Sequence, residues 1–177
     1  LLERRSNFWE KEMKQIFTTL LALCLLNTAS FSDVKLGIIL GFTGPIESLT
    51  PDMAAGAELA IDEINKSKHF SMGKVSGVRA DSTCVDSAAA TTAAERLITS
   101  DKVNGIMGAD CSGVTTAILQ QVAMANGMVM ISPSATSPAL STVEDNGLFF
   151  RTAPSDARQG QVAVSYTHLT LPTRRGV

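Results

Sequence analysis

The chain has 177 residues, of which 45% are apolar and 18% are charged, and its net charge is −2. This length and composition are typical of one ordinary globular domain. A chain so close to neutral lacks the basic surface by which proteins bind nucleic acid or an anionic membrane, so the sequence predicts neither partner. Aromatic residues make up only 5% of the chain, which also argues against a stacking surface for nucleobases.

An export signal is predicted near the N-terminus. Met13 is followed by a lysine, an apolar run from Ile16 to Leu26 and then small residues. A short positive start, an apolar segment too short to span a bilayer comfortably and small residues after it are typical of a secretory signal peptide, which we place at residues 13–32. An uncleaved anchor is the alternative. Residues 1–12 then read as translated leader, and export predicts a periplasmic location.

The first strand and helix of the exported part have clear signals. Val34–Leu40 is a nearly continuous apolar run, typical of a strand buried on both faces of a parallel sheet, and the turn Gly41–Pro45 follows it. Thr50 is expected to cap the next helix, with Pro51 at its first position. The residues expected on one apolar face of this helix are Met53, Ala57, Ala60, Ile61 and Ile64.

Strands and helices alternate through the rest of the chain. Short apolar runs predict the strands, and apolar residues three or four apart predict the helices between them. Asp86 is positioned to cap the second helix. With right-handed crossovers, this order predicts an α/β fold, a doubly wound parallel sheet with helices on both faces. The further elements expected are strands Val75–Ala80, Val103–Met107, Met128–Ile131 and Leu148–Arg151, and helices over 88–99, over 114–125 and from Asp156.

Small polar residues follow two neighbouring strands of this sheet. Ser112 comes shortly after the third strand, and Ser134 and Thr136 follow the fourth. In an open parallel sheet, ligands bind beyond the carboxyl ends of the strands, where Ser112 would also begin a helix whose free amides favour an anion. We therefore predict that both clusters hold one small carboxylate. No arginine stands in either turn, which suits a zwitterion. Any single residue of the three could instead serve only as a cap or turn former.

Cys84 and Cys111 each lie just past a predicted strand, 27 positions apart. In an exported chain a disulfide between them is the favoured interpretation, and it would fix the turn at Ser112. Free thiols packed as small apolar residues are the first alternative. A metal site is the second, and it lacks the paired cysteine and histidine spacing that such sites require.

Catalytic motifs are not found in the sequence. There is no G-x-S-x-G elbow, and Cys111 as a nucleophile would need a histidine, for which only His69 in a polar loop is available. The early glycines have neither the dinucleotide nor the phosphate-loop spacing. Asp81, Asp86 and Asp110 read as caps and turn residues rather than a cation site. The sequence therefore predicts no enzyme, no cofactor and no metal.

Several motifs, in order along the chain, resemble the branched-chain amino-acid periplasmic binding proteins of ABC transporters. The resemblance covers about residues 34–162 and implies a type I periplasmic binding fold, in which two lobes close on a ligand without performing chemistry. The motifs are Gly41-Phe-Thr-Gly-Pro45, the helix Ala55-Gly-Ala-Glu-Leu-Ala-Ile-Asp-Glu-Ile-Asn65, Asp81-Ser-Thr-Cys84, Gly108-Ala-Asp-Cys-Ser112, Met130-Ile-Ser-Pro-Ser-Ala-Thr136 and Phe150-Arg-Thr152.

The resemblance implies roles for individual residues. Ser112 and Thr136 would bind the carboxylate of an amino acid, and the backbone at Ser134 and Ala135 would receive its ammonium group. Leu49 would lie near the ligand side chain, at a place where leucine-type members tend to have an aromatic residue. The family disulfide corresponds to Cys84 and Cys111.

The resemblance also sets expectations for the whole protein. Such proteins are about twice as long, so residues 33–164 would form the first lobe only, with the second lobe missing. The segment 165–177 shows no helical periodicity and is expected to be a non-native tail. The implied function is capture of an amino acid, branched-chain or related, for delivery by a monomer to an ABC permease. The alternative is an amide or urea sensor of the same fold that regulates a partner protein.

Overall fold

The structure, a computed structural model, describes residues 33–67, 70 and 73–170. The leader and signal-peptide predictions for residues 1–32, and His69, lie outside the described residues. Among the helices that the structure describes, none combines the length and the apolar character needed to cross a membrane.

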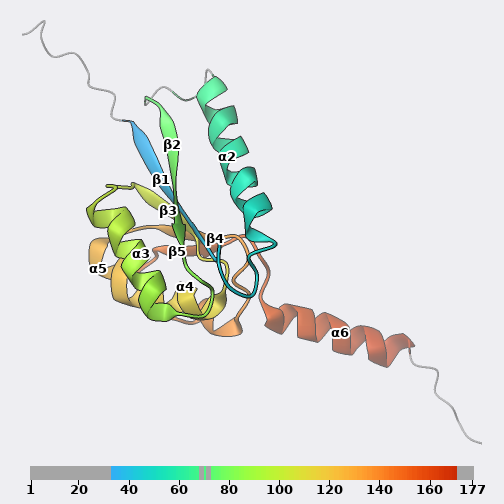
Figure 1. The fold of residues 1–177 in the computed structure, drawn as a ribbon. Coiled ribbons are helices and arrows are strands. Elements are labelled where there is room, and N and C mark those ends of the chain that lie inside the picture. Colours follow the sequence, from blue (N-terminus) through green and yellow to red (C-terminus); the bar gives the residue numbers. More distant parts are fainter. Residues whose placement is uncertain (1–32, 68–69, 71–72, 171–177) are drawn as a thin grey trace, which may run out of the picture. The chain divides into compact units, whose positions relative to one another are not determined.

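Five parallel strands form one sheet in the order β2-β1-β3-β4-β5 (Figure 1). From β1 the chain first crosses to β2 on one side. It then returns past β1 to β3, and continues in that direction to β4 and β5, so the direction of the crossovers reverses once. The predicted doubly wound parallel sheet is therefore confirmed. The strands are β1 (Val34–Leu40), β2 (Val75–Asp81), β3 (Gly105–Gly108), β4 (Met130–Ser132) and β5 (Phe149–Arg151).

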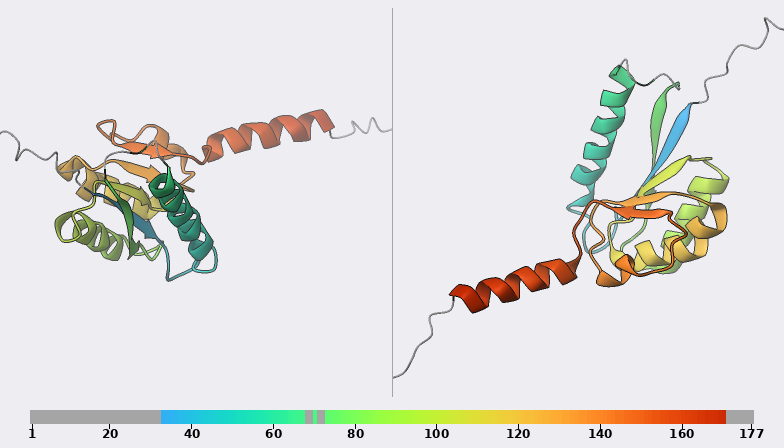
Figure 2. Two further views of the ribbon diagram at one scale, coloured as in Figure 1. Left: turned by 90° about the horizontal axis from the view of Figure 1, so that it is seen from above. Right: turned by 180° about the vertical axis from the view of Figure 1, so that it is seen from behind.

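Helices lie on both faces of the sheet. Helix α2 lies on one face, and helices α3 and α4 lie on the other (Figures 1 and 2). The segments α4, η1 and α5 follow one another without a break, and η1 is a π-helical turn. The helical segments are α2 (Thr50–Lys66), α3 (Ser87–Thr99), α4 (Ser112–Ile118), η1 (Leu119–Ala123), α5 (Met124–Asn126), the 3₁₀ turn η2 (Pro138–Ser141) and α6 (Asp156–Thr170).

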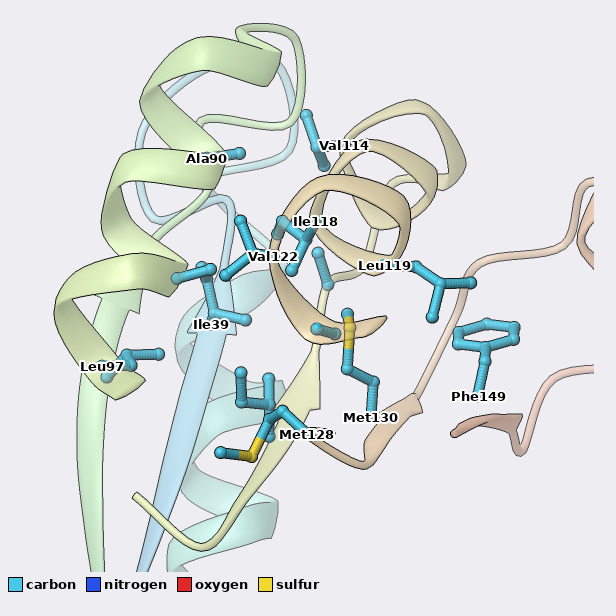
Figure 3. Packing of buried hydrophobic residues seen from close by; sticks show 14 of the residues in the cluster. Ile39, Ala90, Leu97, Val114, Ile118, Leu119, Val122, Met128, Met130 and Phe149 are labelled. Carbon is cyan, nitrogen blue, oxygen red and sulfur yellow. The ribbon is translucent and has the colours of Figure 1, made fainter. Parts of the chain in front are cut away.

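Alternation along β1 divides the core into two clusters. Ile39 points to the face covered by α3 and α4, whereas Ile38 and Leu40 point to the face covered by α2, and all three are buried. The cluster on the α3 and α4 side is larger and extends to Phe149 of β5, which lies beside Leu119 (Figure 3). This larger cluster fixes the positions of β3 and β4, the two strands that precede the predicted site.

The start of α2 differs from the prediction. Thr50 is the first residue of the helix and Leu49 occupies the cap position without a side-chain hydrogen bond. The Thr50 side chain is instead fully buried, and its hydroxyl donates to the carbonyl of Gly41 at 3.1 Å. A hydroxyl that ties the helix to the end of β1 is a tertiary contact, which no local capping rule predicts.

The predicted apolar face of α2 is only partly correct. Ile61 is buried, but Ala60 and Ile64 are exposed, and the buried face includes Ala54 instead. The reason is that α2 packs mainly on β1 and β2. Beyond it, the same face of the sheet leaves Ile131 44% and Phe150 53% exposed.

Helix α6 begins at Asp156, as expected, continues past Val164 into the segment without helical periodicity, and ends at Thr170. The side chains from Asp156 to Thr167 are all exposed. Because this helix buries no face, it needs no apolar periodicity, and periodicity was the only signal available in the sequence. Whether residues 165–177 are native remains a prediction.

Gly44 offers a test of how closely two loops approach. Its φ is +99°, and a Cβ atom added to it would lie 2.5 Å from the carbonyl oxygen of Thr83. Gly44→Ala is therefore expected to lower the free energy of unfolding by more than about 1 kcal/mol. Gly56→Ala is the matched control, because a Cβ there meets open space within α2 and is expected to stabilise by up to about 1 kcal/mol. Urea denaturation measures both, and equal effects would contradict the predicted approach of the loops.

Candidate ligand-binding site

One buried carboxylate joins the loops at the carboxyl edge of the sheet. Asp110 follows β3 and is 3% exposed. One of its oxygens accepts a hydrogen bond from the backbone N–H of Gly41 at 2.8 Å, and the other accepts from the Ser82 hydroxyl at 3.2 Å and the Cys111 N–H at 3.0 Å. The loops after β1, β2 and β3 therefore meet at a single side chain.

A disulfide makes a second link between two of these loops. Cys84 after β2 is bonded to Cys111, the cap residue of α4, with their Cα atoms 5.2 Å apart. In the chain-entropy account, closing a loop of this length stabilises the fold by about 3.5 kcal/mol. The bond therefore holds the start of α4 against the β2 loop, next to Ser112.

Ser112 stands at the first position of α4 and is half-buried. Its hydroxyl oxygen accepts a hydrogen bond from the N–H of Ser137 at 3.1 Å, so the hydroxyl proton is still available for an acceptor. The Cys111 side chain makes no capping hydrogen bond, and the first amides of a helix have no carbonyl partner within it. Ser112 can therefore offer a hydroxyl and backbone amides to one anion.

The loop after β4 packs directly against the loop after β3. The Ser134 hydroxyl donates to the carbonyl of Asp110 at 3.0 Å, and the Ser132 hydroxyl donates to the carbonyl of Ala109. The N–H of Ala135, a fully buried residue, donates in turn to Ser132 at 3.0 Å. Because the Ser134 hydroxyl donates its proton in this way, Ser134 is expected to meet a ligand through its backbone.

Thr136 makes two hydrogen bonds with one residue that the sequence did not single out for binding. Its hydroxyl donates to the carboxylate of Asp156 at 3.0 Å, and the N–H of Asp156 donates to the carbonyl of Thr136 at 3.0 Å. The sequence predicts Asp156 only as a helix start. Its carboxylate nevertheless stands beside the hydroxyl that was expected to bind ligand.

Arg151 is a second residue that the sequence analysis did not identify. Its guanidinium group donates to the carbonyls of Ala135 at 3.3 Å and Ser137 at 2.8 Å, and also to the hydroxyl of Ser141. These acceptors all belong to the loop after β4. The arginine therefore fixes the loop, and no local motif indicates that role.

Leu49 is the predicted site residue for which the structure gives the least support. It lies on the loop after β1 and is 61% exposed. This loop is tied to the Ser112 turn through Gly41 and Asp110. The contact of Leu49 with a ligand therefore stays a prediction.

Asp81 ends β2 and stabilises two loops. Its carboxylate accepts hydrogen bonds from the Thr43 hydroxyl at 2.6 Å and the Thr83 N–H at 2.8 Å. Partial burial alone would raise the pKa of Asp81, but the hydrogen bonds from Thr43 and the neighbouring backbone outweigh it and hold the pKa below its ordinary value of 3.8.

The carboxyl edge of the sheet offers hydrogen-bonding groups and, in the part of the chain that the structure describes, no metal cluster. In the described ranges, no group of three or more His, Cys, Asp or Glu side chains could hold a metal ion. A hollow of about 550 Å³ lies along α6, and its lining includes Pro154, Val162 and Tyr166 but none of the predicted site residues. The groups that the predicted site can offer are therefore hydroxyls, backbone amides and the carboxylates of Asp110 and Asp156.

A model of the periplasmic binding protein family matches residues 33–170. The chain belongs to this family. It is 30% identical over 166 residues to the leucine-specific-binding protein of Salmonella typhimurium, covering 94% of the chain and 44% of that relative. It is 29% identical over 153 residues to the Leu/Ile/Val-binding protein of Escherichia coli K12, covering 86% and 41%. The resemblance to branched-chain amino-acid binding proteins is thus confirmed.

Solved structures agree with these relatives. The chain matches the structure of the branched-chain amino acid transporter substrate-binding protein LivJ of Streptococcus pneumoniae, solved in complex with isoleucine, with a TM-score of 0.70 and 28% sequence identity. The match covers 78% of the chain and 39% of LivJ. LivK, a leucine-binding protein of Thermotoga maritima, has a TM-score of 0.65 and 27% identity, over 76% and 37%. The chain spans less than half the length of the curated relatives it matches. That share corresponds to one lobe of a type I periplasmic binding fold.

The low pKa of Asp81 predicts a pH-dependent stability. A depressed folded-state pKa contributes stability that is fully present above the unfolded value, about pH 4, and is lost as the pH falls through the lower folded value. Asp81→Asn is therefore expected to be less stable than wild type at neutral pH, with a difference that shrinks below about pH 4. Urea denaturation at several pH values measures this. The exposed Glu95→Gln is the control, and a difference for Asp81→Asn that stays constant with pH would contradict the prediction.

Proposed function

We propose that this chain is the first lobe of an exported protein that captures an amino acid, branched-chain or related, and delivers it to an ABC importer. The observation that carries the proposal is the meeting of Ser112 and the 134–136 loop at the ends of two adjacent strands. The predicted export signal and the relatives' names support a periplasmic binding protein rather than an enzyme. No observation favours the amide or urea sensor over this function.

The chemistry of the two loops suits an amino-acid head group. Ser112 supplies a hydroxyl and helix-terminal amides for a carboxylate, and neutral donors of this kind bind an anion without a cationic side chain. Thr136 adds a hydroxyl, which can donate to a ligand carboxylate or to Asp156. The backbone carbonyls at Ser134 and Ala135 are acceptors for an ammonium group.

Asp156 adds the charged partner that an ammonium group requires. Its carboxylate is within hydrogen-bond distance of Thr136, so a ligand carboxylate on Thr136 places the attached ammonium a few ångströms from Asp156. Charge-assisted hydrogen bonds are about twice as strong as neutral ones. We therefore extend the proposed site from Ser112, Ser134, Ala135 and Thr136 to this acidic residue.

Removal of the two hydroxyls tests the carboxylate site. Ser112→Ala combined with Thr136→Ala is expected to weaken leucine binding by at least tenfold, because hydrogen bonds to a charged group contribute about 1.5–3 kcal/mol each. Shifts of backbone amide signals during titration of the ¹⁵N-labelled chain with leucine, isoleucine and valine measure weak binding, as expected for a single lobe. Thr99→Ala with Ser100→Ala, at the far end of α3, is the matched control.

The outcome distinguishes the candidates. Equal affinities in the Ser112 and Thr136 variant and in the control would place the ligand elsewhere. Binding of urea or short amides without binding of amino acids would overturn the amino-acid proposal in favour of the sensor.

The role of Asp156 is tested with two related ligands. Leucine and 4-methylpentanoate share the side chain and carboxylate, but only leucine carries an ammonium group. Asp156→Asn is expected to weaken leucine binding by about tenfold, the loss of one charge-assisted hydrogen bond, and to leave 4-methylpentanoate unchanged or improved. The same titrations measure both affinities. A variant that weakens both ligands equally would show that Asp156 acts only by holding Thr136.

A further inference from the structure

Asp110 is a buried carboxylate with no cationic partner in the part of the chain that the structure describes. It is 3% exposed, and both of its oxygens act only as acceptors, the arrangement of an ionised carboxylate. The ion pairs of the described residues join Arg79 to Glu58 and Arg96 to Asp101, and neither reaches Asp110. Its negative charge is therefore stabilised by hydrogen bonds alone and is not neutralised.

The position of Asp110 brings this charge close to the proposed ligand. Only Cys111 separates it from Ser112 along the chain, so the Cα atoms of Asp110 and Ser112 are at most about 7 Å apart. Its side chain is directed to Gly41, on the β1 side of β3, whereas Thr136 lies on the β4 side. If Ser112 and Thr136 hold the head group of an amino acid, the space toward β1 is left for its side chain. That side chain would then lie close to Asp110.

The surrounding loops do not compensate this charge. The segments 41–49, 82–86 and 109–113 contain no Lys or Arg. Next to them, the carboxylate of Asp81 accepts hydrogen bonds from the Thr43 hydroxyl and the Thr83 N–H, and adds a second negative group. Salt screens a buried charge much less than an exposed one. Two negative charges about 8 Å apart, at an effective dielectric constant of about 20, repel each other enough to weaken an affinity by roughly tenfold to thirtyfold.

We propose that Asp110 is a specificity-determining residue whose buried negative charge excludes amino acids with an anionic side chain. The proposal rests on the proposed function and names the class of ligand more narrowly: zwitterions with a neutral or cationic side chain. Asp110 also holds the loops of the site, so its two effects must be separated by comparing ligands that differ only in charge.

Glutamine and glutamate are such a pair. In the ¹⁵N-labelled chain at neutral pH, glutamate is expected to bind at least tenfold more weakly than glutamine. Asp110→Asn, which is nearly isosteric, is expected to reduce this ratio to threefold or less. A loss of loop order changes both affinities together and leaves their ratio unchanged, so the ratio isolates the charge. Asp86→Asn is the matched control, because Asp86 is an exposed helix cap that asparagine replaces equally well, and it should leave the ratio unchanged.

Each outcome decides the proposal. The proposal is overturned if the ratio of glutamine to glutamate affinity is the same in Asp110→Asn as in the unaltered chain. It is also overturned if Asp110→Asn binds leucine but shows no detectable binding of glutamate. If Asp110→Asn does not fold, Asp110→Ser removes the same charge, and equal binding of glutamate and glutamine by the unaltered chain overturns the proposal without any variant. If no amino acid binds the unaltered chain, the proposed function fails instead.

Discussion

The carboxylate of Asp110 is the interaction on which the rest of the site depends. It accepts hydrogen bonds from the loops after β1, β2 and β3, and its own carbonyl accepts from Ser134 in the loop after β4. Four loops that are far apart in the sequence therefore meet at one residue. The disulfide of Cys84 and Cys111 secures two of the same loops covalently. A binding site made of backbone amides and small hydroxyls needs this support, because such groups have no length with which to adjust to a displaced partner.

The sheet supplies the platform for these loops, but its two faces are unequal. The face under α3 and α4 has a continuous core from Ile39 to Phe149. On the other face, α2 covers β1 and β2, while Ile131 and Phe150 remain exposed. Parallel strands are normally covered on both faces. The strands that carry the proposed site are thus anchored from one side, and the stability of the site follows mainly from the larger cluster.

The sequence was sufficient to predict the fold, because each strand is a short apolar run and each helix has a start signal or an apolar stripe. The sequence also predicted that Ser112 and Thr136 lie at the ends of neighbouring strands, since the parallel topology alone places them there. It could not assign Asp110, Arg151 or Asp156. Their contacts beyond the adjacent residue join positions 10 to 69 residues apart, and a turn aspartate with a structural role has the same local sequence as one without. The sequence also did not show that Ala60 and Ile64 of α2 are exposed, because the spacing of apolar residues does not indicate how much of a sheet a helix covers.

The arrangement of charge explains how the proposed site would select a zwitterion. A carboxylate group would be bound by hydroxyls and helix-terminal amides around Ser112, which bring no net charge. Asp156 offers a full negative charge on the Thr136 side, and Asp110 holds another on the β1 side. In the proposed site a free anion would meet these two carboxylates, while the guanidinium group of Arg151 is engaged by carbonyls of the loop after β4. An amino acid would bring an ammonium group as a partner for one of the carboxylates. Under the proposed function, selectivity for an amino acid over a simple carboxylic acid would follow from the negative charges that surround a neutral anion site.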